Sequence, residues 1–352
     1  MPYNQKEIDT IRELARRVAE FAACKENKLN IQRWKDVNAL RKPDRAPVWC
    51  RPMSCWGELI PASKYVCKDP YLHSIEARLR KVLFKREIND DEPVDSTFFV
   101  ETYFNIEPKN LYGVEIAKHH SGEKGGAWSY EPPLKTPEDF DKLKLPVFTY
   151  NKTKTEDEMS RAHEILGDIL PVKRICVPPG ATQMSDIATA LRGTTELLLD
   201  TVAEPELLHR LMAFLRDWML SAMKQVEDAD LLTRFDTKPT FISDPVGPEP
   251  VNGKITYKNL WFHANSQAFD QVSPEGWKEF DLKYQMSVME KYGYVNYGCC
   301  ENLTHKIDGV LSIPNLRLVT CSAWTNLDVI IEKCAAKYAI MWRQKATDVV
   351  FP

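Results

Sequence analysis

The sequence has no long apolar run and no block of basic residues, and each absence narrows the classes of protein to which it can belong. No apolar run approaches the roughly 20 residues that span a bilayer. The first residues, Met1 to Glu7, contain no apolar signal core. The net charge is −3, which argues against a nucleic-acid partner. We therefore predict a soluble, cytoplasmic protein whose partners include no membrane and no nucleic acid.

Cysteine is too sparse for a disulfide scaffold. The 352 residues include nine cysteines, an odd number, so we expect reduced thiols that are structural, catalytic or metal-bound. The sequence also shows no repeat of about 20–50 residues and no low-complexity segment. Its hydrophobic content of 43% is enough for a large core.

Strand and helix patterns alternate in the second half, which predicts parallel strands joined by crossover helices. Including the first half, strand-like segments centre near residues 48, 99, 175, 241, 262, 296, 319 and 340. About eight such strands suit a (β/α)8 TIM barrel. We expect an α/β protein with an N-terminal helical extension, residues 1–45, before a barrel domain, residues 46–352. The sequence ends ten residues after the last expected strand, so the final barrel helix is expected to be absent.

The stretch from Tyr292 to Glu301 contains the closest grouping of potentially reactive side chains in the sequence. Its β-rich run ends in a glycine, two adjacent cysteines and a carboxylate. In an α/β barrel the reaction site lies at the C-terminal ends of the strands. The preceding strand contains His263 and the following strand ends near Cys321. Three neighbouring segments thus offer an imidazole, three thiols and a carboxylate.

Two registers of this stretch remain open. Side chains alternate along a strand, so if Tyr297 points inward, Cys299 and Glu301 point inward as well. Cys300 would then face the helix layer as a small buried hydrophobe. If the chain bends at Gly298, Cys300 and Glu301 converge instead.

A catalytic zinc takes three protein ligands from Cys, His and carboxylate groups, and thiolates favour zinc. The candidate ligands are Cys299, Cys300, Glu301 and Cys321, and the candidate catalytic groups are Glu301 and His263. Each has a plainer alternative. The thiols can be core residues, the imidazole a hydrogen-bonded core group, and the carboxylate the partner of a neighbouring cation.

Aromatic and charged residues near the expected strand ends can line an apolar mouth for a flat ligand. The candidate substrate contacts are Trp49, Arg51, Trp56, Glu101, Tyr297 and Trp324. A core role for some of the tryptophans is the alternative.

Several segments resemble, in order, the uroporphyrinogen decarboxylase superfamily. Asn38 to Trp49 resembles its opening, and Leu197 to Leu208 its mid-chain helix pair. Ser266 to Phe280 resembles the loop and helix before its central strand, and Pro314 to Arg317 the approach to its seventh strand. The matches extend over most of residues 30–343, and the fold they imply is a (β/α)8 barrel.

Two activities dominate that superfamily: cofactor-free decarboxylation of a porphyrinogen, and zinc-assisted methyl transfer involving a corrinoid protein. The decarboxylase branch has an Arg-Gln-Ala-Gly-Arg run where this chain has residues 51–56, Arg-Pro-Met-Ser-Cys-Trp, without the second arginine. The methyltransferase branch has His-x-Cys where this chain has Tyr297 and Cys299. The Gly-Cys-Cys-Glu strand end resembles a branch whose expected role is methyl transfer from methoxylated or methylamine-like compounds to a corrinoid.

The resemblance therefore implies an enzyme, a corrinoid-dependent methyltransferase in which zinc activates a small methylated substrate. No corrinoid-binding domain is visible, so a separate corrinoid protein is the expected partner. Two alternatives remain. One is a cofactor-free decarboxylase or lyase in which Arg51 and Arg317 clamp a carboxylate. The other is a non-catalytic ligand-binding barrel. The sequence leaves open whether the chain acts alone or as a homodimer.

Overall fold

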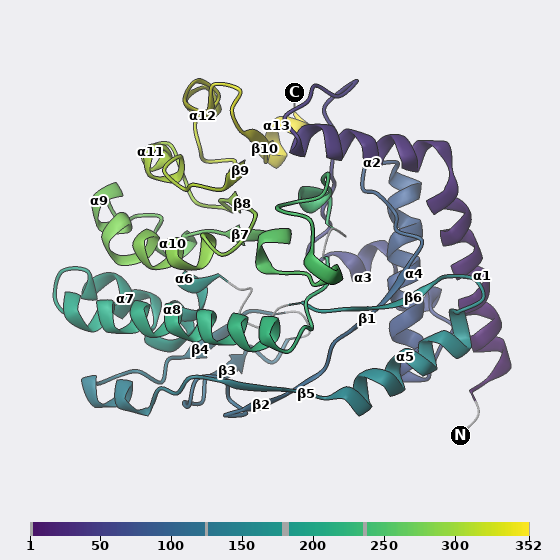
Figure 1. Ribbon diagram of the computed structural model, residues 1–352, viewed down its shortest axis with the longest axis horizontal. Coiled ribbons are helices and arrows are strands. Elements are labelled where there is room, and N and C mark those ends of the chain that lie inside the picture. Colours follow the sequence, from purple (N-terminus) through teal and green to yellow (C-terminus); the bar gives the residue numbers. More distant parts are fainter. Residues whose placement is uncertain (1–2, 124–125, 178–182, 235–237, 352) are drawn as a thin grey trace. The chain divides into compact units, whose positions relative to one another are not determined.

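The computed structural model describes the chain except residues 1–2, 124–125, 178–182, 235–237 and 352 (Figure 1). The protein is mixed α/β and divides into two compact units. Unit 1 comprises residues 1–103, 151–176 and 235–244, and unit 2 comprises residues 104–150, 177–234 and 245–352. The expected domain boundary at residue 45 lies inside the first stretch of unit 1.

Unit 1 is built mainly from helices. They are α1 (Gln5–Ala23), α2 (Lys25–Asn38), α3 (Trp56–Leu59), α4 (Pro70–Ile88) and α5 (Lys152–Leu166). Strands β1 (Phe98–Glu101) and β6 (Val172–Ile175) form a parallel pair. The apolar face of α1 packs against α4 with Ile11, Leu72 and Ile75 fully buried, and Figure 1 shows these helices side by side. Helix α4 begins at Asp69, whose carboxylate accepts the N–H groups of the first turn, followed by proline at the first helical position.

Unit 2 contains a four-stranded parallel sheet in chain order: β7 (Trp261–Ala264), β8 (Tyr294–Tyr297), β9 (Leu316–Cys321) and β10 (Ala339–Trp342). The helices that follow successive strands, α10 (Lys283–Met289), α11 (Ile307–Val310) and α12 (Leu327–Cys334), lie along one side of it in Figure 1. A π-helical turn, Lys278–Leu282, joins α9 (Pro274–Trp277) to α10. This order places the C-terminal ends of four strands at one edge, where a site is expected.

Unit 2 also contains helices and strands outside this sheet. The helices are α6 (Met184–Arg192), α7 (Thr194–Asp200), α8 (Pro205–Asp228) and α13 (Ala346–Val350). Two antiparallel pairs are β2 (Phe104–Glu107) with β5 (Val147–Tyr150) and β3 (Ala117–His120) with β4 (Trp128–Glu131). Strands β3 and β4 were not among the strands expected from the sequence. The five-residue helix α13 follows the last parallel strand, where no final helix was expected.

Six of the eight expected barrel strands are confirmed, and those near residues 48 and 241 are wrong. Residues 46–50 form no strand because carboxylates from elsewhere in the chain bind their backbone. Asp91 accepts the N–H of Val48 at 2.7 Å, and Asp90 accepts the N–H of Cys50 at 2.9 Å. Residues 239–241 form a 3-10 turn that starts at proline. The described strands form one parallel sheet of four, one parallel pair and two antiparallel pairs, so the structure shows an α/β fold in which a closed barrel is not evident among these strands.

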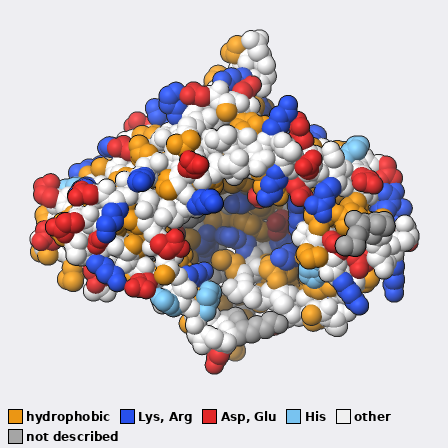
Figure 2. Space-filling view, turned by 90° about the horizontal axis from the view of Figure 1, so that it is seen from below, with side chains coloured by type: hydrophobic (Ala, Val, Ile, Leu, Met, Phe, Trp, Pro, Cys, Tyr) orange, Lys and Arg blue, Asp and Glu red, His pale blue; other side chains and the backbone are white. Residues whose placement is uncertain are grey.

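Among the described residues, no helix combines the length and apolar character that crossing a membrane requires. Acidic and basic side chains intermingle over the outer part of the face shown in Figure 2. This distribution agrees with the small net charge of −3.

Candidate functional site

Strand β8 ends in a bend at Gly298, which has a φ of +108°. A Cβ there would lie 2.6 Å from the carbonyl oxygen of Thr320, so both the dihedral angle and the space favour glycine. The Gly298 N–H still donates to the carbonyl of Ala264 at 2.8 Å, and the chain then leaves the strand. A bend at Gly298 was the second of the two alternatives that the sequence left open.

The bend brings the two adjacent thiols together. The Sγ atoms of Cys299 and Cys300 lie 3.7 Å apart; Cys299 is partly buried and Cys300 is exposed. Arg343, just after β10, places its Nη1 at 3.5 Å from the first sulfur and 3.7 Å from the second. Burial raises the pKa of the Cys299 thiol, whereas the adjacent guanidinium acts in the opposite direction. The result is a thiol pair beside a cation at the sheet edge.

Glu301 does not face the thiols as the second register predicted. Its side chain is buried, with Oε1 accepting the N–H of Ser266 at 3.0 Å and Oε2 accepting the N–H of Cys299 at 2.9 Å. Burial raises the pKa of this carboxyl group. Glu301 thus ties the loop after β7 to the loop after β8 and fixes the backbone that carries the thiols.

A buried polar layer lies beneath these loops. The Ser266 hydroxyl contacts the phenol of Tyr297 and accepts hydrogen bonds from Trp277 Nε1 at 2.7 Å and Gln285 Nε2 at 3.2 Å. Gln285 also donates to Asp281 at 2.8 Å. Complete burial raises the pKa of Asp281 to about 7. Tyr297, expected at the substrate, is therefore a fully buried member of this layer.

Three further candidate residues belong to unit 2: Cys321, His263 and Trp324. Cys321 is buried, with its sulfur 3.8 Å from the carbonyl oxygen of Ser322, and burial raises its pKa to about 11. His263 is partly buried in β7, in register with Asn296 of β8. Trp324 is exposed. Within the part of the chain that the structure describes, no three His, Cys, Asp or Glu side chains are grouped as a metal site.

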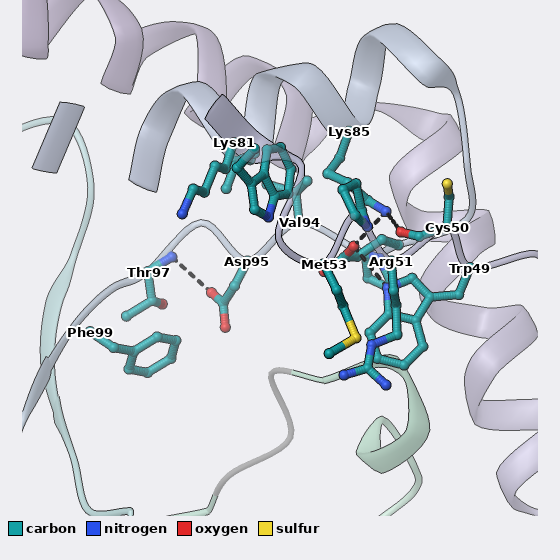
Figure 3. Close-up of a pocket in the computed structure, with 15 residues that line it drawn as sticks. Trp49, Cys50, Arg51, Met53, Lys81, Lys85, Val94, Asp95, Thr97 and Phe99 are labelled. Atoms are coloured by element: carbon teal, nitrogen blue, oxygen red, sulfur yellow. Dashed lines mark hydrogen bonds and ion pairs between the residues drawn. The ribbon is translucent and has the colours of Figure 1, made fainter. Parts of the chain in front are cut away.

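Unit 1 contains a separate cavity of about 440 Å³, shown in Figure 3. The expected substrate contacts Trp49, Arg51 and Trp56 line it, whereas Glu101 ends β1 outside its lining. The Arg51 guanidinium lies 4.7 Å from the centre of the Trp49 ring, and Lys81 Nζ lies 5.4 Å from that of Trp56. Each indole therefore carries a cation beside it, as in aromatic cation sites.

Two other charged side chains at this cavity, Lys85 and Asp95, form ion pairs or hydrogen bonds within the protein. Lys85 is buried and pairs with Asp90 and, at 2.9 Å, with Glu92, which also accepts the Trp49 indole N–H at 2.9 Å. Asp95 accepts the backbone N–H of Thr97 at 2.7 Å. In Figure 3, Lys81 and Asp95 border the open space along with Phe99 and Met53. The cavity thus combines aromatic walls with a cation at its border, which suits a flat ring that carries a carboxylate.

We expect a small aromatic carboxylate such as benzoate to bind this cavity and to change the tryptophan fluorescence. Lys81→Met keeps the length of the side chain and removes its charge, so it should weaken binding by about fivefold, because an exposed ion pair contributes up to about 1 kcal/mol. Lys28→Met, at an exposed position of α2, serves as the control and should leave the titration unchanged. Equal affinity of the Lys81→Met variant and the unsubstituted protein would contradict this role.

Several residues of these sites were not predicted. Arg343 directly follows the last parallel strand, so the strand-end rule that selected Cys321 also applies to it. Asp281 and Gln285 are polar residues four apart on a largely buried helical segment, which is a sequence signal for a buried polar pair. Lys81 gave no signal, because its role depends on a tryptophan that precedes it by 25 residues.

Comparison with known proteins adds no relative: no protein family model, no curated protein and no solved structure matches the chain.

Proposed function

We propose that the chain is an enzyme of the uroporphyrinogen decarboxylase superfamily that moves a methyl group from a small methylated compound to a corrinoid on a separate protein. In this proposal β7 to β10 are four consecutive strands of a (β/α)8 barrel. The observation that carries it is the pair Cys299 and Cys300, 3.7 Å apart beside a guanidinium at the carboxyl end of β8. Soft donors at this edge suit the chemistry of a thiolate-bound metal.

The thiol pair fits two corners of a zinc site. In a tetrahedral site with Zn–S bonds of about 2.3 Å, neighbouring sulfurs are about 3.8 Å apart, close to the 3.7 Å between these two. The guanidinium of Arg343 lies beside both sulfurs. Hydrogen-bond donors in such a position orient the ligands of a metal. Glu301 and Cys321 do not fit as ligands in this arrangement, since backbone groups occupy both. Cys299 and Cys300 would supply two of the three protein ligands that a catalytic zinc takes, and the zinc would supply Lewis-acid activation of the substrate heteroatom.

The protein groups have distinct tasks in this proposal. Glu301 fixes the thiol-bearing backbone through its bonds to Ser266 and Cys299. Arg343 offsets negative charge on the sulfurs. A corrinoid carried by a separate protein would accept the methyl group in this proposal.

Metal content and methyl transfer test the proposal together. We expect about one zinc per chain by elemental mass spectrometry, lost in the Cys299→Ser/Cys300→Ser variant, because each serine replaces a soft ligand. Methyl transfer to a corrinoid protein should be lost in parallel. Cys24→Ser, at a partly exposed thiol outside the cavity lining, is the matched control and should keep both, because serine can also accept the Asn27 N–H at the start of α2. Zinc that is absent from the reduced, chelator-free protein, or that persists in the double variant, would overturn this account.

A further inference from the structure

The thiol pair has a second chemical capability that does not depend on methyl transfer. We propose that Cys299 and Cys300 are a modification site, which a hydroperoxide converts reversibly to a disulfide between adjacent residues. The geometry of the pair, its exposure and the nearby cation each support this inference.

The two sulfurs point to the same side, which neighbouring residues of a strand do not do. Alternation would send successive side chains to opposite faces. The bend at Gly298 takes both cysteines out of the strand, and Glu301 holds the N–H of Cys299 in place. From the present 3.7 Å, the sulfurs must approach by about 1.7 Å to reach the disulfide length of about 2.05 Å. Rotation about the side-chain bonds, together with an adjustment of the backbone between the two residues, closes this gap.

Access and charge also favour reaction at this pair. Cys300 is exposed, Cys299 is partly buried, and one guanidinium nitrogen of Arg343 contacts both sulfurs. Reactive cysteines occupy partly exposed, electropositive surroundings of this kind. Cys321 and Cys334 differ, because both are buried and therefore shielded from a dissolved oxidant. Oxidation should therefore be selective for the pair.

The reaction balances with a hydroperoxide as the oxidant. The sulfur of Cys300 attacks the terminal peroxide oxygen, the O–O bond breaks, and the alcohol leaves with a proton to give a sulfenic acid. The sulfur of Cys299 then attacks the sulfenic sulfur, the S–O bond breaks, and water leaves. In total, two thiols and one hydroperoxide give one disulfide, one alcohol and one water.

The disulfide is expected to reopen readily. Adjacent Cα atoms are about 3.8 Å apart, less than the 4.4–6.8 Å of ordinary disulfides. Strained, exposed disulfides are the labile and regulatory ones. While closed, the pair offers no thiolate to a metal, so oxidation would switch off a zinc site at this position. The disulfide itself requires neither zinc nor substrate.

Mass spectrometry of the full-length, chelator-treated protein tests the inference. The reduced protein is exposed to limiting hydrogen peroxide, its remaining thiols are alkylated, and the peptide that contains residues 299 and 300 is analysed. We expect that peptide to lose two hydrogens and to take no alkyl group, and dithiothreitol should restore double alkylation. At the same dose Cys50, the matched exposed thiol, should still be alkylated.

Two variants sharpen the test. Cys299→Ser should leave Cys300 without its partner, so that a sulfenic acid or a mixed adduct replaces the internal disulfide. Arg343→Gln should slow closure severalfold, because it removes the cation beside both sulfurs. Continued double alkylation of the pair at doses that oxidise Cys50 would overturn the proposal, as would direct conversion of Cys300 to a sulfinic acid with Cys299 intact. Neither result bears on methyl transfer, which is measured separately.

Discussion

Glu301→Ala should lower the free energy of unfolding by about 2–5 kcal/mol, because each unsatisfied buried N–H costs about 1–3 kcal/mol. The substitution removes the acceptor of two backbone groups, the N–H of Ser266 and the N–H of Cys299. Urea unfolding followed by circular dichroism measures the change. The same substitution should separate the thiols, since it releases the loop that carries them.

Two further variants define what the carboxylate contributes. Glu301→Gln keeps one acceptor oxygen but turns an amide N–H₂ toward the other backbone N–H, so its loss should be intermediate. It should retain the fold and lose methyl transfer, because the thiol-bearing backbone is no longer held from both sides. Glu332→Ala, at an exposed position of α12, should change stability by no more than about 0.5 kcal/mol. A Glu301→Ala variant as stable as this control would exclude a structural role for the carboxylate.

Above pH 7, Asp281→Asn should make the protein more stable than the unsubstituted chain by about 2–4 kcal/mol. This size follows from the pKa difference between the folded and unfolded states, because each pKa unit corresponds to about 1.36 kcal/mol. Burial raises the folded-state pKa of Asp281 to about 7, whereas an unfolded Asp titrates near about 3.9. Between these values only the folded state keeps the proton, so this group's contribution to stability falls as the pH rises from 4 to 7. Asparagine does not titrate in this range, so the variant should not lose stability in this way as the pH rises.

The surroundings of Asp281 determine the size of this effect. Desolvation raises its pKa, the negative charge of Glu301 adds to the rise, and Lys306 and the hydrogen bond from Gln285 oppose it. Chemical unfolding of both proteins at several pH values from 4 to 8 gives the difference curve. Asp308→Asn, which removes an exposed partner of Lys333, is the control and should give a flat difference. An Asp281→Asn curve parallel to that of the unsubstituted protein would refute the shifted carboxyl group.

The parallel strands were predictable because each carries its signal locally. Buried apolar residues continue through β8 and β9, and short helices follow both. The expected strand at 46–50 failed because its backbone partners, Asp90 and Asp91, are about 40 residues away. Strands β3 and β4 were missed since each has only four residues and their side chains are mostly exposed.

The site was predictable in its composition but not in its arrangement. The strand-end rule identified Cys299, Cys300 and Glu301 as neighbours at the sheet edge. The sequence left a regular strand and a bend at Gly298 as alternatives; the structure has the bend, but it brings Cys299 and Cys300 together rather than Cys300 and Glu301. The direction of the Glu301 side chain depends on the N–H of Ser266, a contact across 35 residues that no local pattern encodes.

The interleaving of the two units constrains how the chain is synthesised. Unit 1 needs three stretches, the last of which ends at residue 244, and two stretches of unit 2 are translated between them. A ribosome therefore releases helices α1 to α4 long before the segment that completes their unit. The same interleaving leaves no single cut in the chain that would yield either unit whole.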